Sequence, residues 1–270
     1  MQASKLRSLG LLFLFIAAAF LVIGVGPSFV PFAGTFDRPE PAICKIIGAA
    51  LLFGLTWCFV RRDRANRAML GLGPSRRNAR ILLGSLAAGG VIILLWLLVL
   101  RLLVPFRVEA GNLTATGFLF SVLVYLFGSV TEELAFRGYP FLRLRRAYGV
   151  AIAVGIVSVA FGLFHAPGMH GAALAKVIAI TALSSLIFCL GILRTGTLWS
   201  AIGLHAGMNL VLHSIFGAGD ASRASLFKIV PDAPAFGWDP WFWSMTAVLV
   251  ASVLMLVLGN PKARRAHAMA

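Results

Sequence analysis

The residues of this chain that could do chemistry stand inside hydrophobic sequence. Glu132 and Glu133 lie side by side within LVYLFGSVTEELAFRGYPF, whereas the other acidic residues fall in connecting stretches or at the ends of hydrophobic runs. A carboxylate in such surroundings costs at least ~2.5 kcal/mol on membrane-insertion scales, so two in succession require a structural or chemical reason. Arg137 shares a helical face with Glu133, four residues later, which predicts an ion pair. Glu132 is rotated by ~100° from Glu133 and is left without that partner.

A second polar position is His165, at the end of the hydrophobic run VSVAFGLFH. Phe161 precedes it by one helical turn, and Ala-Pro-Gly follows directly and predicts a break in the helix. Taken alone, this histidine is better explained as a hydrogen-bonded packing residue, because neutral imidazole is the cheapest titratable group to bury.

A third polar position lies in LWSAIGLHAGMNLVLH. His205 and Asn209 are four residues apart and share a helical face. Gly203 and Gly207 beside them allow a neighbouring helix backbone to approach closely. An interhelical hydrogen bond would also explain this pattern. His213 continues the stripe ~12 Å along the axis from His205, too far to share a metal ion with it, and is assigned to the helix end.

These side chains have the composition of a hydrolytic site. A buried carboxylate can act as general base on a water molecule held by an imidazole. A histidine and an amide can supply hydrogen bonds to the oxyanion that forms when water attacks a carbonyl.

The elements that would position these residues are membrane helices. The chain has 270 residues, of which 60% are hydrophobic and only 12% charged, whereas about a quarter of an average soluble domain is charged. Hydrophobic runs long enough to cross a bilayer recur along the sequence. They predict an all-α, polytopic bundle of about eight helices, forming one membrane domain over 1–270. The predicted spans are 9–26, 42–60, 81–104, 118–136, 150–165, 174–193, 198–215 and 241–259, and all three polar positions fall within 118–215.

The net charge of +15 would suggest a nucleic-acid partner in a soluble protein, but the distribution of the basic residues favours membrane topology. With the N-terminus inside, 17 of the 24 Lys and Arg fall on the cytoplasmic side. The opposite side receives seven, namely Arg38, Lys45, Arg101, Arg107, Lys176, Arg223 and Lys228. This predicts a cytoplasmic-membrane protein with both termini cytoplasmic, in contact with lipid and not with nucleic acid. The basic stretch 61–80 is interpreted as an orienting loop.

Three motifs in order resemble those of the CPBP family, the CAAX-processing and bacteriocin-processing (Abi-type) intramembrane endopeptidases. EELAFR is similar to the family's EExxxR motif, FGLFH to its FxxxH motif, and HAGMN to its third motif. The resemblance spans roughly residues 118–215 and implies that these helices form the catalytic core. The same resemblance implies an eight-helix membrane fold and a peptide or membrane-protein substrate. It also implies roles: Glu132 and His165 activate water, and His205 and Asn209 stabilise the oxyanion. The supporting residues would be Glu133, Arg137 and Phe161.

Other functions remain open at this point. Glu132, His165 and His205 could in principle ligate zinc, although the HExxH spacing of soluble zinc proteases is absent, and no cofactor is assigned. The same residues could form a polar lock in a non-catalytic scaffold or immunity protein. A transporter pathway is less consistent, because the polar residues gather in the second half of the chain without a matching first half.

The predicted spans contain one conflict. Counted at 1.5 Å per residue, Glu132 would lie ~20 Å from the outer face and His165 only a few ångströms from it. The two can meet only if their helix is broken, displaced or strongly tilted.

Overall fold

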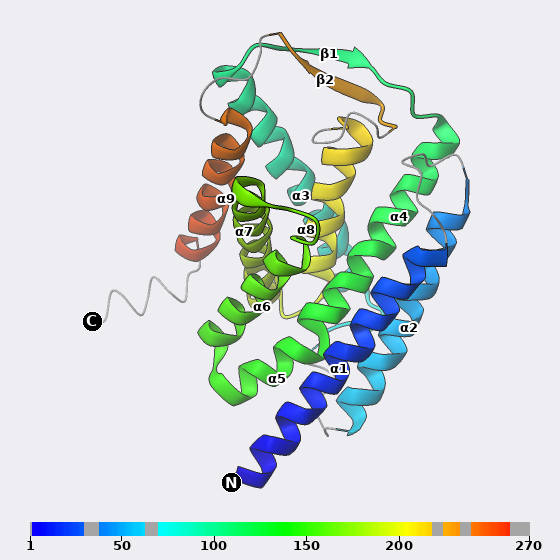
Figure 1. Ribbon diagram of the computed structural model, residues 1–270, viewed down its shortest axis with the longest axis vertical. Coiled ribbons are helices and arrows are strands. Elements are labelled where there is room, and N and C mark those ends of the chain that lie inside the picture. Colours follow the sequence, from blue (N-terminus) through cyan, green and yellow to red (C-terminus); the bar gives the residue numbers. More distant parts are fainter. Residues whose placement is uncertain (1, 30–37, 63–69, 218–223, 233–238, 260–270) are drawn as a thin grey trace.

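A computed structural model describes residues 2–29, 38–62, 70–217, 224–232 and 239–259 of the chain. Within these ranges the chain forms eight continuous helices and one pair of strands (Figure 1). The segments are α1 (Gln2–Phe29), α2 (Glu40–Arg62), α3 (Arg76–Leu103), β1 (Phe106–Ala110), α4 (Ala115–Glu133), η2 (Leu134–Gly138), α5 (Tyr139–Tyr148), α6 (Val150–Phe164), α7 (Gly171–Thr195), α8 (Trp199–Asn209), η3 (Leu210–Ile215), β2 (Phe227–Pro231) and α9 (Pro240–Leu258). The π-helical turns η2 and η3 join α4 to α5 and extend α8. The predicted all-α fold class is confirmed, and each predicted span overlaps one helix.

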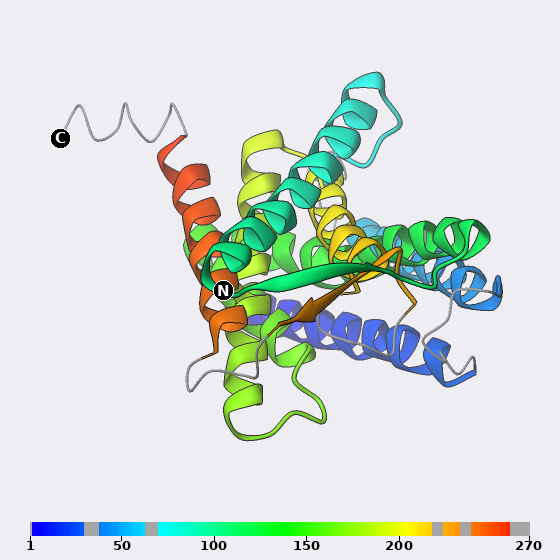
Figure 2. The same cartoon turned by 90° about the horizontal axis from the view of Figure 1, so that it is seen from above.

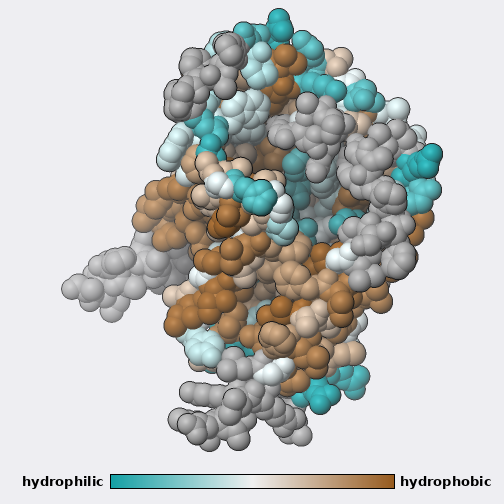
Figure 3. Space-filling view, viewed as in Figure 1, coloured by the Kyte–Doolittle hydropathy of each residue, from teal (hydrophilic) through white to brown (hydrophobic). Residues whose placement is uncertain are grey.

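Five of the described helical segments are long and apolar enough to cross a membrane. They are α2, α3, the continuous α4–α5 segment, α7 and α9, and shorter apolar helices lie over Gly10–Gly24 and Val150–Phe164. Large hydrophobic side chains are exposed along these helices, for example Leu98 of α3 at 57% and Met255 of α9 at 70%. Figure 3 shows this hydrophobic surface across the middle of one face, with hydrophilic residues towards both ends. The chain is a multi-pass membrane protein.

Local sequence signals explain where several helices begin and end. Ser75 and Thr114 cap α3 and α4, accepting hydrogen bonds from the backbone N–H groups of Asn78 and Gly117 at 3.1 and 3.0 Å. Gly196, at φ 73°, ends α7 in the left-handed conformation that glycine adopts without steric cost.

Glycines bring α8 close to α3, as the sequence predicted. A Cβ at Gly203 would lie 2.5 Å from the carbonyl oxygen of Leu82, and one at Gly207 would lie 2.0 Å from that of Leu86. Larger side chains at these positions would push the helices apart. The backbone that carries His205 is therefore packed directly against α3.

Hydrogen bonds connect helix ends that the distribution of basic residues had placed on the same side of the membrane. Arg77, at the start of α3, donates to the backbone oxygen of Thr195 at 2.6 Å. Arg194 donates to the backbone oxygens of Leu256 and Gly259 at 3.3 and 3.0 Å. The start of α3 and the ends of α7 and α9 therefore lie together, on one side of the bundle.

The strand pair was not predicted. Strands β1 and β2 are antiparallel, with Phe106 opposite Pro231 and Ala110 opposite Phe227. They lie at the end of the bundle opposite the N-terminus and extend across it between α3 and α4 (Figures 1 and 2). Each strand has only five residues and lies between two predicted spans. A pattern of that length is too short to recognise.

Two predicted boundaries were wrong. The helix expected to end at 136 continues through η2 and α5 to Tyr148, so the arginines at 143, 145 and 146 are helical. The stretch 61–80, interpreted as a loop, includes the last residues of α2 and the first of α3, while its residues 63–69 lie outside the described ranges.

Candidate active site

The polar residues predicted from three separate motifs line one cavity. Glu132 is the penultimate residue of α4, His165 caps the C-terminal end of α6, and His205 and Asn209 belong to α8. All four contribute to the wall of a cavity of about 500 Å³ among the helices. The three motifs, distant in sequence, therefore form one site.

The conflict over the depth of His165 is resolved by the length of α6. Gly149, at φ 85°, ends α5 and starts α6, which has 15 residues. Such a helix is about 22 Å long, shorter than the ~30 Å hydrocarbon core. The chain turns at His165, before Pro167. Nε2 of His165 lies 3.7 Å from Oε2 of Glu132, so the two depths counted from the span ends cannot both be right. A helix of this length that starts at one membrane face ends inside the hydrocarbon core.

Glu133 is the buried centre of the site. Its Oε1 accepts hydrogen bonds from Nη1 of Arg137 at 2.8 Å and from Nδ1 of His205 at 2.9 Å. The Glu133 and Arg137 side chains have no exposed surface. The pair at i and i+4 forms as predicted, but the second bond, to the helix carrying the third motif, was not foreseen. Glu133 thus connects the first and third motifs.

Arg137 extends this network on the side away from the cavity. It also donates to the hydroxyl of Ser185, which donates to that of Ser158 at 3.0 Å. The guanidinium carbon lies 4.4 Å from the ring centre of Phe161 and 5.2 Å from that of Phe188. Arg137 is therefore enclosed by hydroxyls and aromatic faces, which suits a desolvated guanidinium.

The hydrogen bonds of both histidines define which ring nitrogen carries a proton. Nδ1 of His165 lies 2.9 Å from the backbone oxygen of Phe161, and Nδ1 of His205 lies 2.9 Å from the Glu133 carboxylate. These oxygens only accept, so both Nδ1 atoms donate. In the neutral rings, Nε2 therefore carries a lone pair.

Both Nε2 atoms face the same carboxylate oxygen. Oε2 of Glu132 lies 3.7 Å from Nε2 of His165 and 3.8 Å from Nε2 of His205. These separations are too long for direct hydrogen bonds, and this Oε2 has no hydrogen-bond partner among the described residues. The side chains of Glu132 and His165 are 21% and 30% exposed, against 6% for His205. The three polar atoms thus face one another across a gap at the cavity wall, and Oε2 itself is buried although 21% of the Glu132 side chain is exposed.

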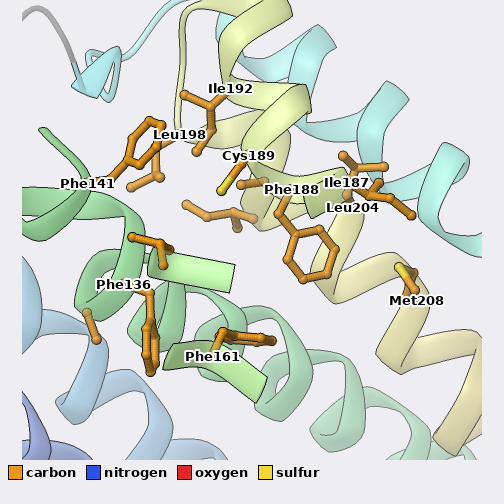
Figure 4. Close-up of a cluster of buried hydrophobic side chains, with 14 of the residues drawn as sticks. Phe136, Phe141, Phe161, Ile187, Phe188, Cys189, Ile192, Leu198, Leu204 and Met208 are labelled. Atoms are coloured by element: carbon orange, nitrogen blue, oxygen red, sulfur yellow. The ribbon is translucent and has the colours of Figure 1, made fainter. Parts of the chain in front are cut away.

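Aromatic rings hold the two imidazoles. The Phe161 ring centre lies 4.5 Å from that of His165 and 5.7 Å from that of His205. Phe188 stacks on His205 at 4.9 Å with an interplanar angle of 18°. Figure 4 shows Phe136, Phe161 and Phe188 within one hydrophobic cluster. Sequence reasoning included Phe161 but missed Phe188 and Ser185, since a phenylalanine in a hydrophobic helix carries no signal of its own.

Asn209 and His213 lie further along the cavity wall. Asn209 is the last residue of α8, and the π-helical turn η3 begins directly after it. The His213 ring stacks on Tyr125 of α4, with centres 5.6 Å apart. Both of these residues line the cavity. His213 is close to the helix end, as predicted, but it also belongs to the wall of the site.

The three residues that could in principle ligate zinc carry suitable donor atoms. Glu132, His165 and His205 offer one carboxylate oxygen and two Nε2 atoms, and both imidazoles have the Nδ1 partners typical of metal-bound histidine. Over the described part of the chain, however, no group of three or more His, Cys, Asp or Glu residues is arranged to hold a metal ion. The donor types fit zinc, whereas their present spacing is not that of a formed metal site.

Comparison with known families agrees with the three motifs. The family model described as "Type II CAAX prenyl endopeptidase Rce1-like" matches residues 114–211. This range includes Glu132, His165, His205 and Asn209. The match confirms the predicted resemblance. No curated protein matches the chain.

Proposed function

We propose that this chain, a protease by its Rce1-like residues 114–211, hydrolyses a peptide bond within the membrane with a water molecule activated by Glu132. The observation that carries this proposal is the pair of distances from Oε2 of Glu132, 3.7 and 3.8 Å, to the Nε2 atoms of His165 and His205. A water molecule admitted between these atoms would be within hydrogen-bonding reach of all three.

The two imidazoles take different roles in the proposed reaction. Because Nδ1 of His165 donates to the backbone oxygen of Phe161, Nε2 can accept a hydrogen bond from the attacking water, while Glu132 accepts the other proton. His205 must donate from Nε2 to the oxyanion, which requires a proton on both ring nitrogens. Glu133 at 2.9 Å and Glu132 at 3.8 Å supply the negative charge that faces this imidazolium. With Arg137, the site then holds two carboxylates and two cations.

Glu132 accepts and later returns the one proton that the proposed reaction transfers. Water transfers one proton to Glu132 as its oxygen attacks the carbonyl carbon. The oxyanion of the tetrahedral intermediate accepts hydrogen bonds from His205 and the Asn209 amide. Glu132 returns its proton to the amide nitrogen as the C–N bond breaks, leaving a carboxylic acid and an amine. Glu133 and Arg137 touch no substrate in this scheme and act as positioning residues.

The decisive experiment compares the N-termini of membrane proteins in cells that express the wild type or Glu132→Gln. The amide introduced in this variant preserves the shape of the side chain but cannot accept the proton. We expect a set of N-termini that are present with the wild type and absent with the variant at equal expression. Identical sets would contradict the proposal.

A matched control keeps the chemical change and moves it outside the cavity. Glu109 lies on β1, opposite Lys228, and its side chain is 54% exposed. Glu109→Gln should give the wild-type set of termini. A loss of the same termini with this variant would show that the effect of Glu132→Gln is not specific to the site.

A zinc-dependent form of the same protease is the second candidate, supported by the donor types described above. The two forms differ in the response to chelation. The purified enzyme should keep its activity after exhaustive dialysis against a chelator if Glu132 acts directly on water. Loss of activity that added zinc restores would favour the metal form.

We also propose a cytoplasmic-membrane location with both termini in the cytoplasm. The contacts of Arg77 and Arg194 support this orientation, because they gather basic helix ends on one side of the bundle. Cysteine labelling from the two sides of sealed vesicles would test it: a cysteine placed in β2 should react only from the outer side.

A further inference from the structure

One basic residue lies where a membrane helix normally has an apolar one. Lys45 follows Ala42 and precedes Ala49 on a stripe of α2 that faces the protein, with those alanines 2% and 4% exposed. The lipid-facing side of the same helix carries exposed isoleucines, namely Ile43, Ile46 and Ile47. The sequence had placed Lys45 only among the basic residues of the outer side. Its position on the inward stripe calls for another role.

Lys45 packs against α4 next to the proposed catalytic residues. A Cβ at Gly128 would lie 3.9 Å from both Cδ and Cε of Lys45, and one at Gly48 would lie 3.7 Å from Oγ1 of Thr131. The absence of a side chain at Gly128 leaves room for the lysine stem. Gly128 precedes Glu132 by four residues, so the two lie about one turn, or ~6 Å, apart along one face of α4.

Lys45 lines the same cavity as Glu132, His165 and Asn209. It forms no ion pair within 4.0 Å with any acidic residue in the described ranges. By comparison, Arg137 is paired with Glu133 and Lys176 with Asp239. A half-buried cation without an acidic partner, in a mainly apolar cavity, is a binding position for an anion.

We propose that Lys45 binds a carboxylate of the peptide substrate and so selects substrates that carry one near the cleaved bond. The proposal rests on the function proposed above. An extended peptide advances about 3.3–3.6 Å per residue. One helical turn plus the reach of the lysine side chain therefore corresponds to about one to three residues between the carboxylate and the scissile bond.

A peptide can offer this carboxylate from two sources. One is the α-carboxylate at its C-terminus, and the other is an aspartate or glutamate side chain. Both would accept the same charge-assisted hydrogen bonds from the ammonium group. The proposal concerns the carboxylate, and the experiment separates the two sources.

The test measures binding, so it does not depend on turnover. Full-length Glu132→Gln protein in lipid nanodiscs is titrated with fluorescent apolar peptides that end in a free carboxylate or in an amide. A third peptide ends in an amide and carries one aspartate, and a fourth carries asparagine in its place. The same titrations are made after adding Lys45→Gln, Lys45→Met, which suits the apolar stripe, or Lys228→Gln on β2 as a matched control.

We expect amidation to weaken binding about tenfold or more with Lys45 present, and less than twofold with either Lys45 variant. Lys228→Gln should behave as the parent. If only the aspartate peptide shows this dependence on Lys45, the carboxylate comes from a side chain.

Three results would overturn the proposal. Amidation and the asparagine exchange could have the same effect with and without Lys45, none of the peptides could bind, or the Lys45 variants could bind every peptide as the parent does. The last result would indicate that the ammonium group only reaches the headgroup region. None of these results decides whether Glu132 activates water, because that question is answered by the comparison of N-termini.

Discussion

The buried pair of Glu133 and Arg137 allows a prediction that separates stability from catalysis. Arg137→Met removes the cation and leaves the Glu133 carboxylate buried, with only His205 as partner. Breaking a buried ion pair in this way costs about 3–5 kcal/mol of unfolding free energy. Glu133→Leu/Arg137→Met removes both charges, and replacement of a buried pair by apolar residues is often neutral or stabilising by about 1–4 kcal/mol.

The double variant should therefore be more stable than Arg137→Met, although it carries one substitution more. We expect the double variant to regain most of the stability that Arg137→Met loses, since the introduced methionine and leucine can pack against Phe161 and Phe188. It should nevertheless have no activity. The introduced leucine cannot accept the Nδ1–H of His205, which in the wild type lies 2.9 Å from the Glu133 carboxylate, so the imidazole loses both its orientation and its facing charge.

Reversible unfolding in mixed detergent micelles measures the stability part, and peptide cleavage by the same preparations measures the activity. Ser185→Ala is the control, because it removes one hydrogen bond of Arg137 and keeps the pair; we expect a loss of about 1 kcal/mol and little change in activity. If the double variant is no more stable than Arg137→Met, the pair itself stabilises the fold and our reasoning about its burial is wrong. An active double variant would refute the positioning role of Glu133.

Three further outcomes follow from other parts of the molecule. Gly207→Ala places a Cβ 2.0 Å from a backbone oxygen of α3, so it should destabilise the fold by about 1–3 kcal/mol, whereas Gly155→Ala, with open space around it, should not; thermal unfolding measures both. Asn209→Ala should lower kcat about 10²–10³-fold with little change in KM if the amide contacts the oxyanion, and an unchanged kcat would exclude that contact. Burial alone would raise the pKa of the Asp239 carboxyl, but hydrogen bonds from Lys176 and the first turn of α9 lower it below its usual value. The stability that this carboxylate contributes is therefore present above its unfolded pKa of about 4 and lost as the pH falls through the lower folded pKa, so the difference in melting temperature between the wild type and Asp239→Asn should shrink in that range.

The predictions that rest on residue spacing within a single helix agree with the structure. The bond between Glu133 and Arg137 follows from a separation of four residues, and the close approach at Gly203 and Gly207 follows from the size of glycine. Both depend on one helix and its geometry. The membrane helices themselves follow from hydrophobic length alone.

Contacts between helices were harder to predict from the sequence, because they depend on how the helices are placed relative to one another. The end of α6 was predicted to within one residue, but the meeting of His165 with Glu132 was concealed by the assumption that each predicted span ends at a membrane face. The bond from His205 to Glu133 and the stacking of Phe188 on His205 arise from packing, and hydrophobic pattern does not encode them. The π-helical turns after Glu133 and Asn209 likewise have no sequence signature that we could use.

The adjacent glutamates illustrate how one helical turn can serve two chemical needs. Because successive residues of a helix point ~100° apart, Glu133 is directed into the protein and Glu132 into the cavity, with side chains 0% and 21% exposed. A single carboxylate could not both hold Nδ1 of His205 and remain available to water, since the first task buries it and the second requires access. Arg137 neutralises the buried carboxylate, whereas Lys45, which also lines the cavity, is in our proposal the cation that meets a carboxylate of the substrate.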